Sequence, residues 1–158
     1  MKVLRKTYKG LISHLNANQI FVFGSNTQGR HGKGSALQAV KWGAIYGSSQ
    51  GLMGRTYAIT TKDLTKPTHP SVMPDYIVPQ IRRLYWFAKA NKSLEFLIPY
   101  SAKSRNLNGY TSEDMAVMFY SACNPDDGIP ENIIFEEGFA KLIQDLQQQP
   151  NVQTKKGN

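Results

Sequence analysis

The sequence predicts an α/β protein, a three-layer α/β/α sandwich around a mainly parallel mixed sheet. Short apolar runs of strand length alternate along the chain with segments of helical periodicity. Strands that alternate with helices indicate a parallel sheet covered on both faces. The 158 residues contain no internal repeat or linker, which predicts one domain over residues 1–149 and a disordered tail at 150–158.

The first half of the chain is predicted to form an edge strand, two core strands and one helix. Alternating residue types at 1–10 indicate the edge strand. The apolar run at 20–23 and the β-branched, aromatic run at 56–60 indicate the core strands. Residues 35–42 suit a helix, whereas the glycines between 43 and 54 predict a long loop.

The second half continues the alternation, with helices expected at 75–91, 111–122 and 138–148 and strands at 94–98 and 132–135. The first of these helices has apolar residues at intervals of three and four: Ile77, Ile81, Leu84, Tyr85 and Ala88. Thr111, followed by two acids, is the expected N-cap of the second. Four further aromatic residues fall at helical spacings and are assigned to the core: Trp42, Trp86, Phe87 and Phe119.

Composition narrows the class of protein. No run of eighteen apolar residues is present, which argues against a membrane span. Residues 1–10 lack the apolar region of a signal peptide, so a cytoplasmic location is expected. Cys123 is the only cysteine, which excludes an internal disulfide and a cysteine-based zinc site, and we expect neither a metal nor a cofactor.

The net charge of +8 is unevenly distributed along the chain. No acidic residue precedes Asp63, whereas nine basic residues do: Lys2, Arg5, Lys6, Lys9, Arg30, Lys33, Lys41, Arg55 and Lys62. From residue 80 onward, acidic and basic residues balance. Such segregation favours a polyanionic partner, which could be a nucleotide, another phosphorylated ligand or nucleic acid.

A glycine-rich loop between the strand at 20–23 and the helix at 35–42 is the predicted binding site. The strand run stops at Gly24-Ser25-Asn26, and the loop then carries Gly29, Arg30, His31, Gly32, Lys33 and Gly34. Glycines let backbone N–H groups approach a ligand, and a helix N-terminus adds roughly half a positive charge. These features indicate an anion site.

Two more polar loops follow strands and are predicted to join the first at one edge of the sheet. In open α/β sheets, ligands bind outside the carboxyl ends of the strands. The predicted ligand-binding residues of the three loops are Gly24, Ser25, Asn26, Gly29, Arg30, His31, Gly32, Lys33, Gly34 and Ser35, then Thr61, Lys62 and Asp63, then Tyr100, Ser101, Lys103, Arg105, Asn108, Gly109 and Tyr110.

The sequence resembles macrodomains over roughly 115 residues. The resemblance rests on Phe23-Gly24-Ser25-Asn26, on the glycine loop through Gly34-Ser35-Ala36, and on the later Pro99…Asn108-Gly109-Tyr110. The blocks FVFGSNTQGRHGKGSALQA and GLMGRTYAITTKD more closely resemble an uncharacterised family of small phage and prophage non-structural proteins. The resemblance implies a macrodomain-like fold, ADP-ribose or a related nucleotide as ligand, and the cytoplasm of a bacterium or phage-infected host.

The macrodomain resemblance also implies roles for individual residues. It places Asn26 at the distal ribose, residues 32–35 in the first phosphate loop and residues 101–110 in the second. This chain departs from the family at two places: Phe23 stands where a first asparagine is usual, and no acid precedes Asp63 to match the aspartate that binds adenine. The basic residues Lys103 and Arg105 in the second loop would suit an extra phosphate or a nucleic acid strand.

Three residues are candidates for catalysis: Asn26, His31 and Asp63. His31 lies in the glycine loop and has an ordinary pKa near 6.5, so it could act as a base or contact a phosphate. Asp63 could orient a water, bind a ribose hydroxyl or pair with Lys62. Tyr100 and Tyr110 could stack on a base or pack in the core.

Two classes of function remain open at this stage. The first is a pocket that binds an ADP-ribose-like or other phosphorylated nucleotide, or hydrolyses an ADP-ribose linkage. The second is a nucleic-acid-binding module that uses the basic N-terminal half. Steep loss of affinity with salt would indicate nucleic acid. The sequence does not specify an oligomeric state.

Overall fold

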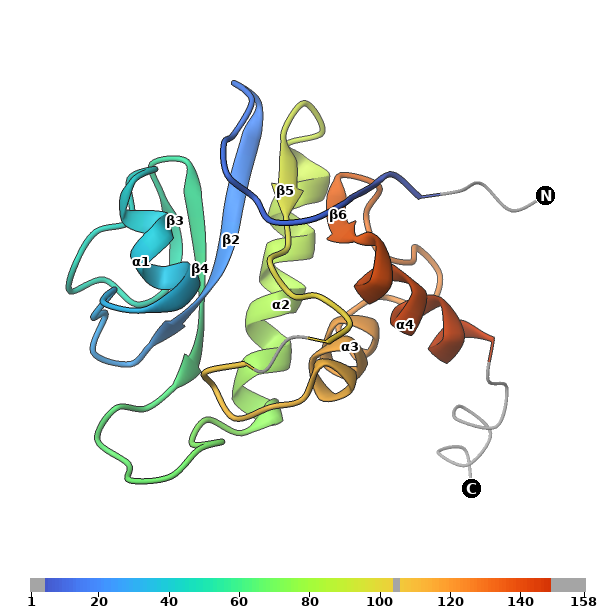
Figure 1. Ribbon diagram of the computed structural model, residues 1–158. Helices are drawn as coiled ribbons and strands as arrows, with labels where there is room; N and C mark the ends of the chain where they lie inside the picture. The colour runs from blue at the N-terminus through green and yellow to red at the C-terminus, as the bar shows by residue number, and fades with distance from the viewer. Residues whose placement is uncertain (1–4, 104–105, 149–158) are drawn as a thin grey trace.

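The computed structural model describes residues 5–103 and 106–148, and its sheet explains the alternation in the sequence (Figure 1). Six strands form one sheet in the order β1-β6-β5-β2-β4-β3. Their bounds are β1 Thr7–Tyr8, β2 Gln19–Asn26, β3 Gly51–Met53, β4 Thr56–Lys62, β5 Glu95–Leu97 and β6 Ile133–Glu136. All neighbouring strands are parallel except β3 and β4, which confirms the predicted mixed, mainly parallel sheet.

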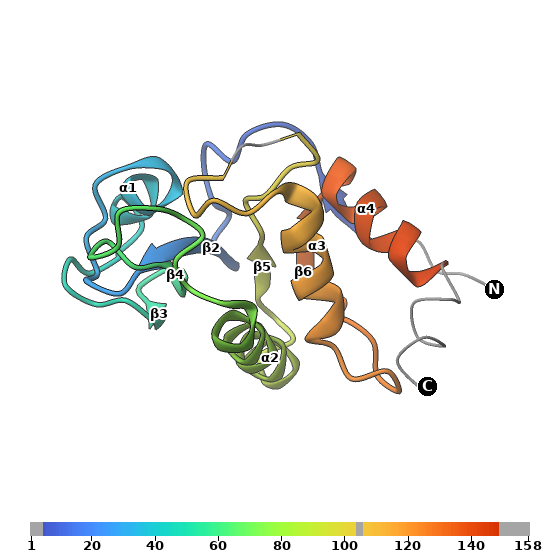
Figure 2. The same ribbon diagram turned by 90° about the horizontal axis from the view of Figure 1, so that it is seen from below.

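The described part of the chain contains four helices, which lie on both faces of the sheet (Figures 1 and 2). They are α1 Gly34–Val40, α2 Pro74–Ala90, α3 Ser112–Ser121 and α4 Glu137–Gln147. The helix α3 begins at the N-cap that the sequence predicts, Thr111. The structure adds a capping box, in which the Thr111 side chain accepts from the Asp114 N–H and the Asp114 carboxylate accepts from the Thr111 N–H. No helix in the two described ranges is long and apolar enough to cross a membrane.

Alternate side chains of the strands divide the core between the two faces. Ile20 and Val22 of β2 pack with Phe96 of β5 against α2, α3 and α4. Phe21 and Phe23 of β2 pack on the other face, where α1, Ile12, Leu15 and Trp42 cover them. This division follows from the period of two along a strand.

Several boundaries differ from the sequence expectations. The edge strand β1 covers only two residues, and Met1 to Leu4 lie outside the described residues. The strand β2 continues through Gly24 to Asn26, where β4 still pairs with it. The glycine-rich passage after α1 contains β3, a three-residue edge strand that the sequence analysis missed. The predicted tail at 150–158 also lies outside the described residues.

The expectation that Trp86 belongs to the core is wrong. Phe119 is fully buried, but Trp86 is 77% exposed. The apolar stripe of α2 turns Tyr85 and Leu84 inward, and the next residue, rotated by about 100° on the helix, faces solvent. Trp86 therefore lies on the outer face of α2.

Candidate functional site

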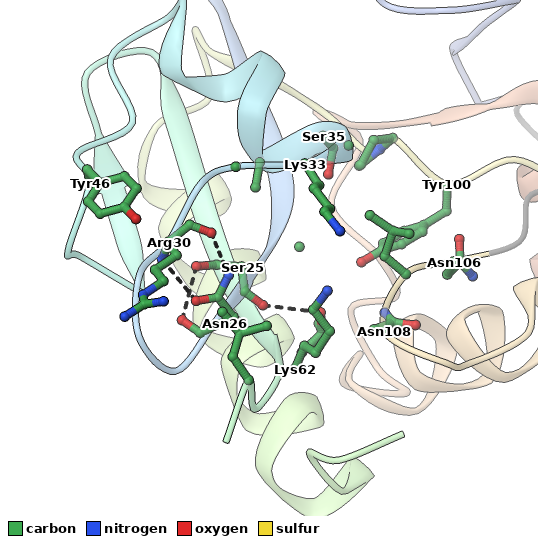
Figure 3. A pocket seen from close by; sticks show the side chains of 18 residues that line it. Ser25, Asn26, Arg30, Lys33, Ser35, Tyr46, Lys62, Tyr100, Asn106 and Asn108 are labelled. Atoms are coloured by element: carbon green, nitrogen blue, oxygen red, sulfur yellow. Dashed lines mark hydrogen bonds between the residues drawn. The ribbon is translucent and has the colours of Figure 1, made fainter. Parts of the chain in front are cut away.

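A cavity of about 470 Å³ opens at the carboxyl ends of β2, β4 and β5 (Figure 3). The parallel arrangement brings these ends to one edge, so the three polar loops meet there as the sequence predicts. The lining residues come from the end of β2 and the glycine loop, from the end of β4, and from the loop after β5. They are Gly24, Ser25, Asn26, Arg30, Gly32, Lys33, Gly34, Ser35, Ala36, Tyr46, Thr61, Lys62, Leu64, Pro99, Tyr100, Asn106, Leu107 and Asn108.

The structure brings together only part of the predicted site. Twelve of the predicted residues line the cavity: Gly24, Ser25, Asn26, Arg30, Gly32, Lys33, Gly34, Ser35, Thr61, Lys62, Tyr100 and Asn108. Seven described ones do not: Gly29, His31, Asp63, Ser101, Lys103, Gly109 and Tyr110. Arg105 lies outside the described residues.

Asn26 holds the glycine loop in shape. Its Oδ1 accepts from the Arg30 backbone N–H at 2.9 Å, and its Nδ2 donates to the Arg30 carbonyl at 2.7 Å. Gly29 closes the turn between them with a φ of +67°, and a Cβ there would lie 2.4 Å from the Gly47 carbonyl carbon. Asn26 is therefore committed to the loop, and Gly29 is required by the fold.

The backbone after this turn offers a row of unused donors. Within the described residues, the N–H groups of residues 32–36 have no hydrogen-bond partner. Lys33 is the N-cap of α1, and its side chain does not cap the helix. Gly32 differs from its neighbours because its φ lies outside the left-handed region and a Cβ there would meet no atom within 4 Å. The fold therefore does not require glycine at position 32. A ligand lying close to this backbone would require it, because a Cβ would block its approach.

The cavity is positively charged. Figure 3 shows the amino groups of Lys33 and Lys62 pointing into the same space, whereas the Arg30 guanidinium points away from it. Among the described lining residues none is aspartate or glutamate. A ligand with negative charge is therefore attracted, and a cation is repelled.

Other cations of the N-terminal half serve the fold instead. The Arg5 guanidinium donates to three backbone carbonyls of residues 129–133 and lies 5.7 Å from the centre of the Phe135 ring. The Arg55 guanidinium donates to two carbonyls of residues 15–16. Lys6 pairs with Glu95 at 2.7 Å, and Lys9 lies 3.8 Å from Glu137.

Tyr100 presents an unused hydroxyl to the cavity. The residue is 8% exposed, and in the described part of the chain its hydroxyl has no hydrogen-bond partner. The hydroxyl lies 3.1 Å from the position of a Cβ on Gly24, so glycine at 24 leaves room for it. Burial raises the pKa of Tyr100 well above its ordinary value, so the group stays a neutral phenol that can donate.

His31 is not placed to act on a ligand in the cavity. It is 2% exposed, and its Nε2 lies 2.9 Å from the Ile45 carbonyl, to which it must donate because a carbonyl only accepts. Its ring lies edge-on to those of Phe23 and Tyr46, at centroid distances of 5.3 and 6.3 Å. His31, which the sequence suggested as a base or a phosphate contact, is therefore packed inside the protein behind the loop.

Asp63 also does not line the cavity. Its Oδ1 accepts from the Thr65 N–H at 2.9 Å and the Thr65 hydroxyl at 2.6 Å, closing the turn after β4. Hydrogen bonds from Thr65, and further ones from Gln28 and Thr27, lower the pKa of Asp63 to about 2. A carboxylate with this pKa is a poor base near neutral pH.

The second predicted loop is held by its own contacts. Gly109 has a φ of +87°, and a Cβ there would lie 2.6 Å from the peptide between His69 and Pro70. The Tyr110 hydroxyl donates to the Val72 carbonyl, and its ring is buried in the core rather than open for stacking. Of the remaining predicted residues, Ser101 accepts from the Ser112 hydroxyl through its carbonyl, and Lys103 is exposed outside the lining.

Three exposed apolar side chains at the cavity were missed by the sequence analysis. Tyr46 is 68%, Leu107 56% and Leu64 39% exposed, and all three line the cavity. Leu107 reaches across to the glycine loop, since its Cδ1 lies 2.9 Å from the position of a Cβ on Gly34. Leu107 falls inside the predicted second loop, so its position there was the only signal in the sequence.

Searches for matching family models, curated proteins and solved structures found no match to this chain. The described residues also contain no group of three or more histidine, cysteine, aspartate or glutamate side chains that could hold a metal ion.

Proposed function

We propose that the cavity binds a phosphorylated nucleotide of the ADP-ribose kind and that the chain has a macrodomain-like three-layer fold. One observation carries the ligand class. Backbone N–H groups at residues 32–36, which have no partner among the described residues, adjoin a cavity that holds Lys33 and Lys62 and no carboxylate among its described lining residues. The fold proposal is supported by helices on both faces of the sheet and by a strand that ends in Asn26 before a glycine loop and a helix.

The phosphate of the ligand would lie against Gly32 and the unpaired N–H groups. Charge-assisted hydrogen bonds from backbone N–H groups are stronger than neutral ones, and the absence of a Cβ at Gly32 allows close approach. Lys33 and Lys62 neutralise the charge from two sides. The Tyr100 hydroxyl, which has no partner in the described protein, donates to a ligand oxygen.

The nucleoside would lie toward the exposed side chains of Tyr46, Leu64 and Leu107. A small number of polar groups beside apolar lining is the usual composition of a ligand pocket, and the volume of about 470 Å³ falls within the usual range. Because no carboxylate lies among the described lining residues, nothing matches the aspartate that binds adenine in macrodomains. We therefore expect the phosphate to contribute more to affinity than the base.

Binding is favoured over hydrolysis. Of the three catalytic candidates, His31 and Asp63 do not line the cavity, and Asn26 is bonded to the loop backbone. A hydrolase needs a group within reach of the attacking water. Nucleic-acid binding by the basic N-terminal half loses support, because Arg5, Lys6, Lys9 and Arg55 are engaged in contacts within the protein.

Calorimetry and thermal unfolding with ADP-ribose, AMP and adenosine test the proposal. A ligand at about 100 times its Kd stabilises a protein by about 2.7 kcal/mol, which for a domain of this size raises Tm by about 5–11 °C. We expect the two phosphorylated compounds to bind and adenosine to fail. The variant Lys33→Ala/Lys62→Ala should lose binding, whereas the charge-matched control Lys41→Ala/Lys141→Ala, with exposed lysines outside the cavity, should keep it.

Two results would contradict the proposal. Absence of any stabilisation by phosphorylated nucleotides at millimolar concentration would remove the ligand class. Release of ADP-ribose from modified protein or nucleic acid by the wild type would show that the site is catalytic and that the preference for binding is wrong.

A further inference from the structure

The outer face of α2 carries an exposed tryptophan beside two cations without partners. Trp86 is 77% exposed, more than any other aromatic side chain in the described ranges. Arg82 and Arg83 are exposed, and neither side chain forms a hydrogen bond or ion pair within the described residues. None of the three residues lines the cavity, and α2 covers the opposite face of the sheet from α1 (Figure 2).

The helix places these three side chains together. Arg82 and Arg83 precede Trp86 by four and three residues, the spacings at which side chains adjoin on a helix surface. A long side chain on a helix leans toward the N-terminus, so the indole lies over the turn that carries the two arginines. Trp86 has no ring or cation–π contact with the described residues, which leaves its faces open.

The same surface continues to the edge of the sheet. Burial raises the pKa of Tyr57 on β4, and the charge of the Arg83 guanidinium opposes this rise. Arg83 therefore lies near this strand. Tyr57 is partly exposed and pairs across the strands with Leu52, which is 50% exposed on the edge strand β3. We call these five residues, Leu52, Tyr57, Arg82, Arg83 and Trp86, the α2 outer surface.

Charge on this surface has one sign. At the C-terminal end of α2, Lys89 is neutralised by Asp127 at 2.8 Å. The one acid on α2, Asp75, lies in its first turn, about 10 Å along the axis from Arg82 at 1.5 Å per residue. The two arginines thus have no ion-pair partner in the described part of the chain, and guanidinium groups suit bidentate contacts to phosphate.

We propose that the α2 outer surface binds single-stranded nucleic acid, with Trp86 stacking on a base and Arg82 and Arg83 contacting the backbone phosphates. Aromatic platforms beside cations are the usual means of binding single strands without sequence preference. An acidic polypeptide would satisfy the charge but would supply no planar base for the indole. Contacts to about two phosphates predict a slope of log K against log salt of about −1.4.

Fluorescence anisotropy with an oligothymidylate of about 12 nucleotides tests this surface at about 50 mM salt. The probe carries a 5′-hydroxyl and a 3′-fluorophore, so that no terminal phosphate can enter the cavity. We expect Trp86→Ala to weaken binding about 5- to 140-fold and Trp86→Phe to keep most of it. Exposed substitutions of this kind leave stability almost unchanged.

Three double variants, each with the same loss of charge, distinguish phosphate contact at this surface from an effect of net charge. Arg82→Ala/Arg83→Ala should weaken binding and flatten the salt slope, whereas Lys41→Ala/Lys141→Ala, with the same change in charge, should do neither. Lys33→Ala/Lys62→Ala should bind the probe like the wild type. Unchanged binding by Trp86→Ala, equal weakening by the control pair, or equal competition by poly-glutamate would overturn the proposal.

Discussion

The pair Gly32→Ala and Gly29→Ala tests the proposal that one glycine of the loop serves a ligand, whereas the other is required by the fold. Both residues belong to the same loop, and each substitution adds a single methyl group. A Cβ at Gly32 would meet no atom within 4 Å, whereas one at Gly29 would lie 2.4 Å from the Gly47 carbonyl carbon. Gly29 also has a φ of +67°, in the region that side chains other than glycine rarely adopt.

The two substitutions should shift stability in opposite directions. Gly32→Ala restricts the unfolded chain at a position without strain, which stabilises by about 0.4–1 kcal/mol. Gly29→Ala costs about 1–2 kcal/mol for the left-handed backbone, before the clash is relieved. At about 2–4 °C per kcal/mol, Tm should rise by about 1–4 °C for the first variant and fall by at least 2–8 °C for the second.

Ligand affinity should respond to Gly32→Ala in spite of its unchanged or higher stability. In the proposed binding mode, the added methyl group stands where the phosphate would approach the N–H groups of residues 32–36. The loss of one hydrogen bond to a charged group costs about 1.5–3 kcal/mol, equivalent to about 10- to 140-fold in Kd. Calorimetry with ADP-ribose at one temperature measures this change, and thermal unfolding without ligand measures stability.

If Gly32→Ala bound ADP-ribose with wild-type affinity, the proposal that the phosphate contacts these N–H groups would be refuted, because the added methyl group would obstruct that contact. A drop in both affinity and Tm for Gly32→Ala would contradict the inference that the fold does not require glycine at this position.

Three further predictions concern single side chains. Tyr100→Phe should leave Tm unchanged and weaken ligand binding, because the Tyr100 hydroxyl has no partner in the described protein. Tyr110→Phe should instead lower stability by about 0.5–1.5 kcal/mol, because it removes the hydrogen bond to the Val72 carbonyl. Thermal unfolding measures both effects on stability. Asn26→Ala removes two hydrogen bonds to the loop backbone and should cost about 1–3 kcal/mol in chemical unfolding; an unaltered midpoint would contradict its role as the loop support. Asp63 has a pKa lowered to about 2, so its stabilisation is complete above about pH 4 and is lost as pH falls toward 2. Asp63→Asn should flatten the acid limb of a pH titration of Tm, and an identical acid limb in the variant would refute this.

Much of the fold was readable because its signals are local. Apolar runs, helical spacings and the N-cap signal of α3 identified the core strands and all four helices. The parallel order then brought the three loops to one edge. The strand β3 escaped because it is three residues long, follows glycine-rich loop and exists only by pairing with β4. The formation of β3 depends on its pairing with β4, and the local sequence pattern does not indicate this pairing.

The site was less readable, because composition does not say where a side chain points. His31 and Lys33 stand two residues apart in the same loop, yet one packs behind it against Ile45 and the other enters the cavity. That difference follows from the turn that Asn26 and Gly29 impose on the backbone. Tyr46 could not be predicted as a lining residue, since it lies in a passage without any pattern.

The number of basic residues in the N-terminal half also does not show which of them can meet a ligand. A count of basic residues treats the clamped Arg5 guanidinium and the open Lys33 amino group alike. In the binding mode proposed for the cavity, fixed N–H dipoles supply much of the attraction, and enclosed interactions are screened less by salt. At the α2 outer surface, Arg82 and Arg83 act from solvent and displace counterions. Increasing salt should therefore weaken oligonucleotide binding more steeply than nucleotide binding in the same protein.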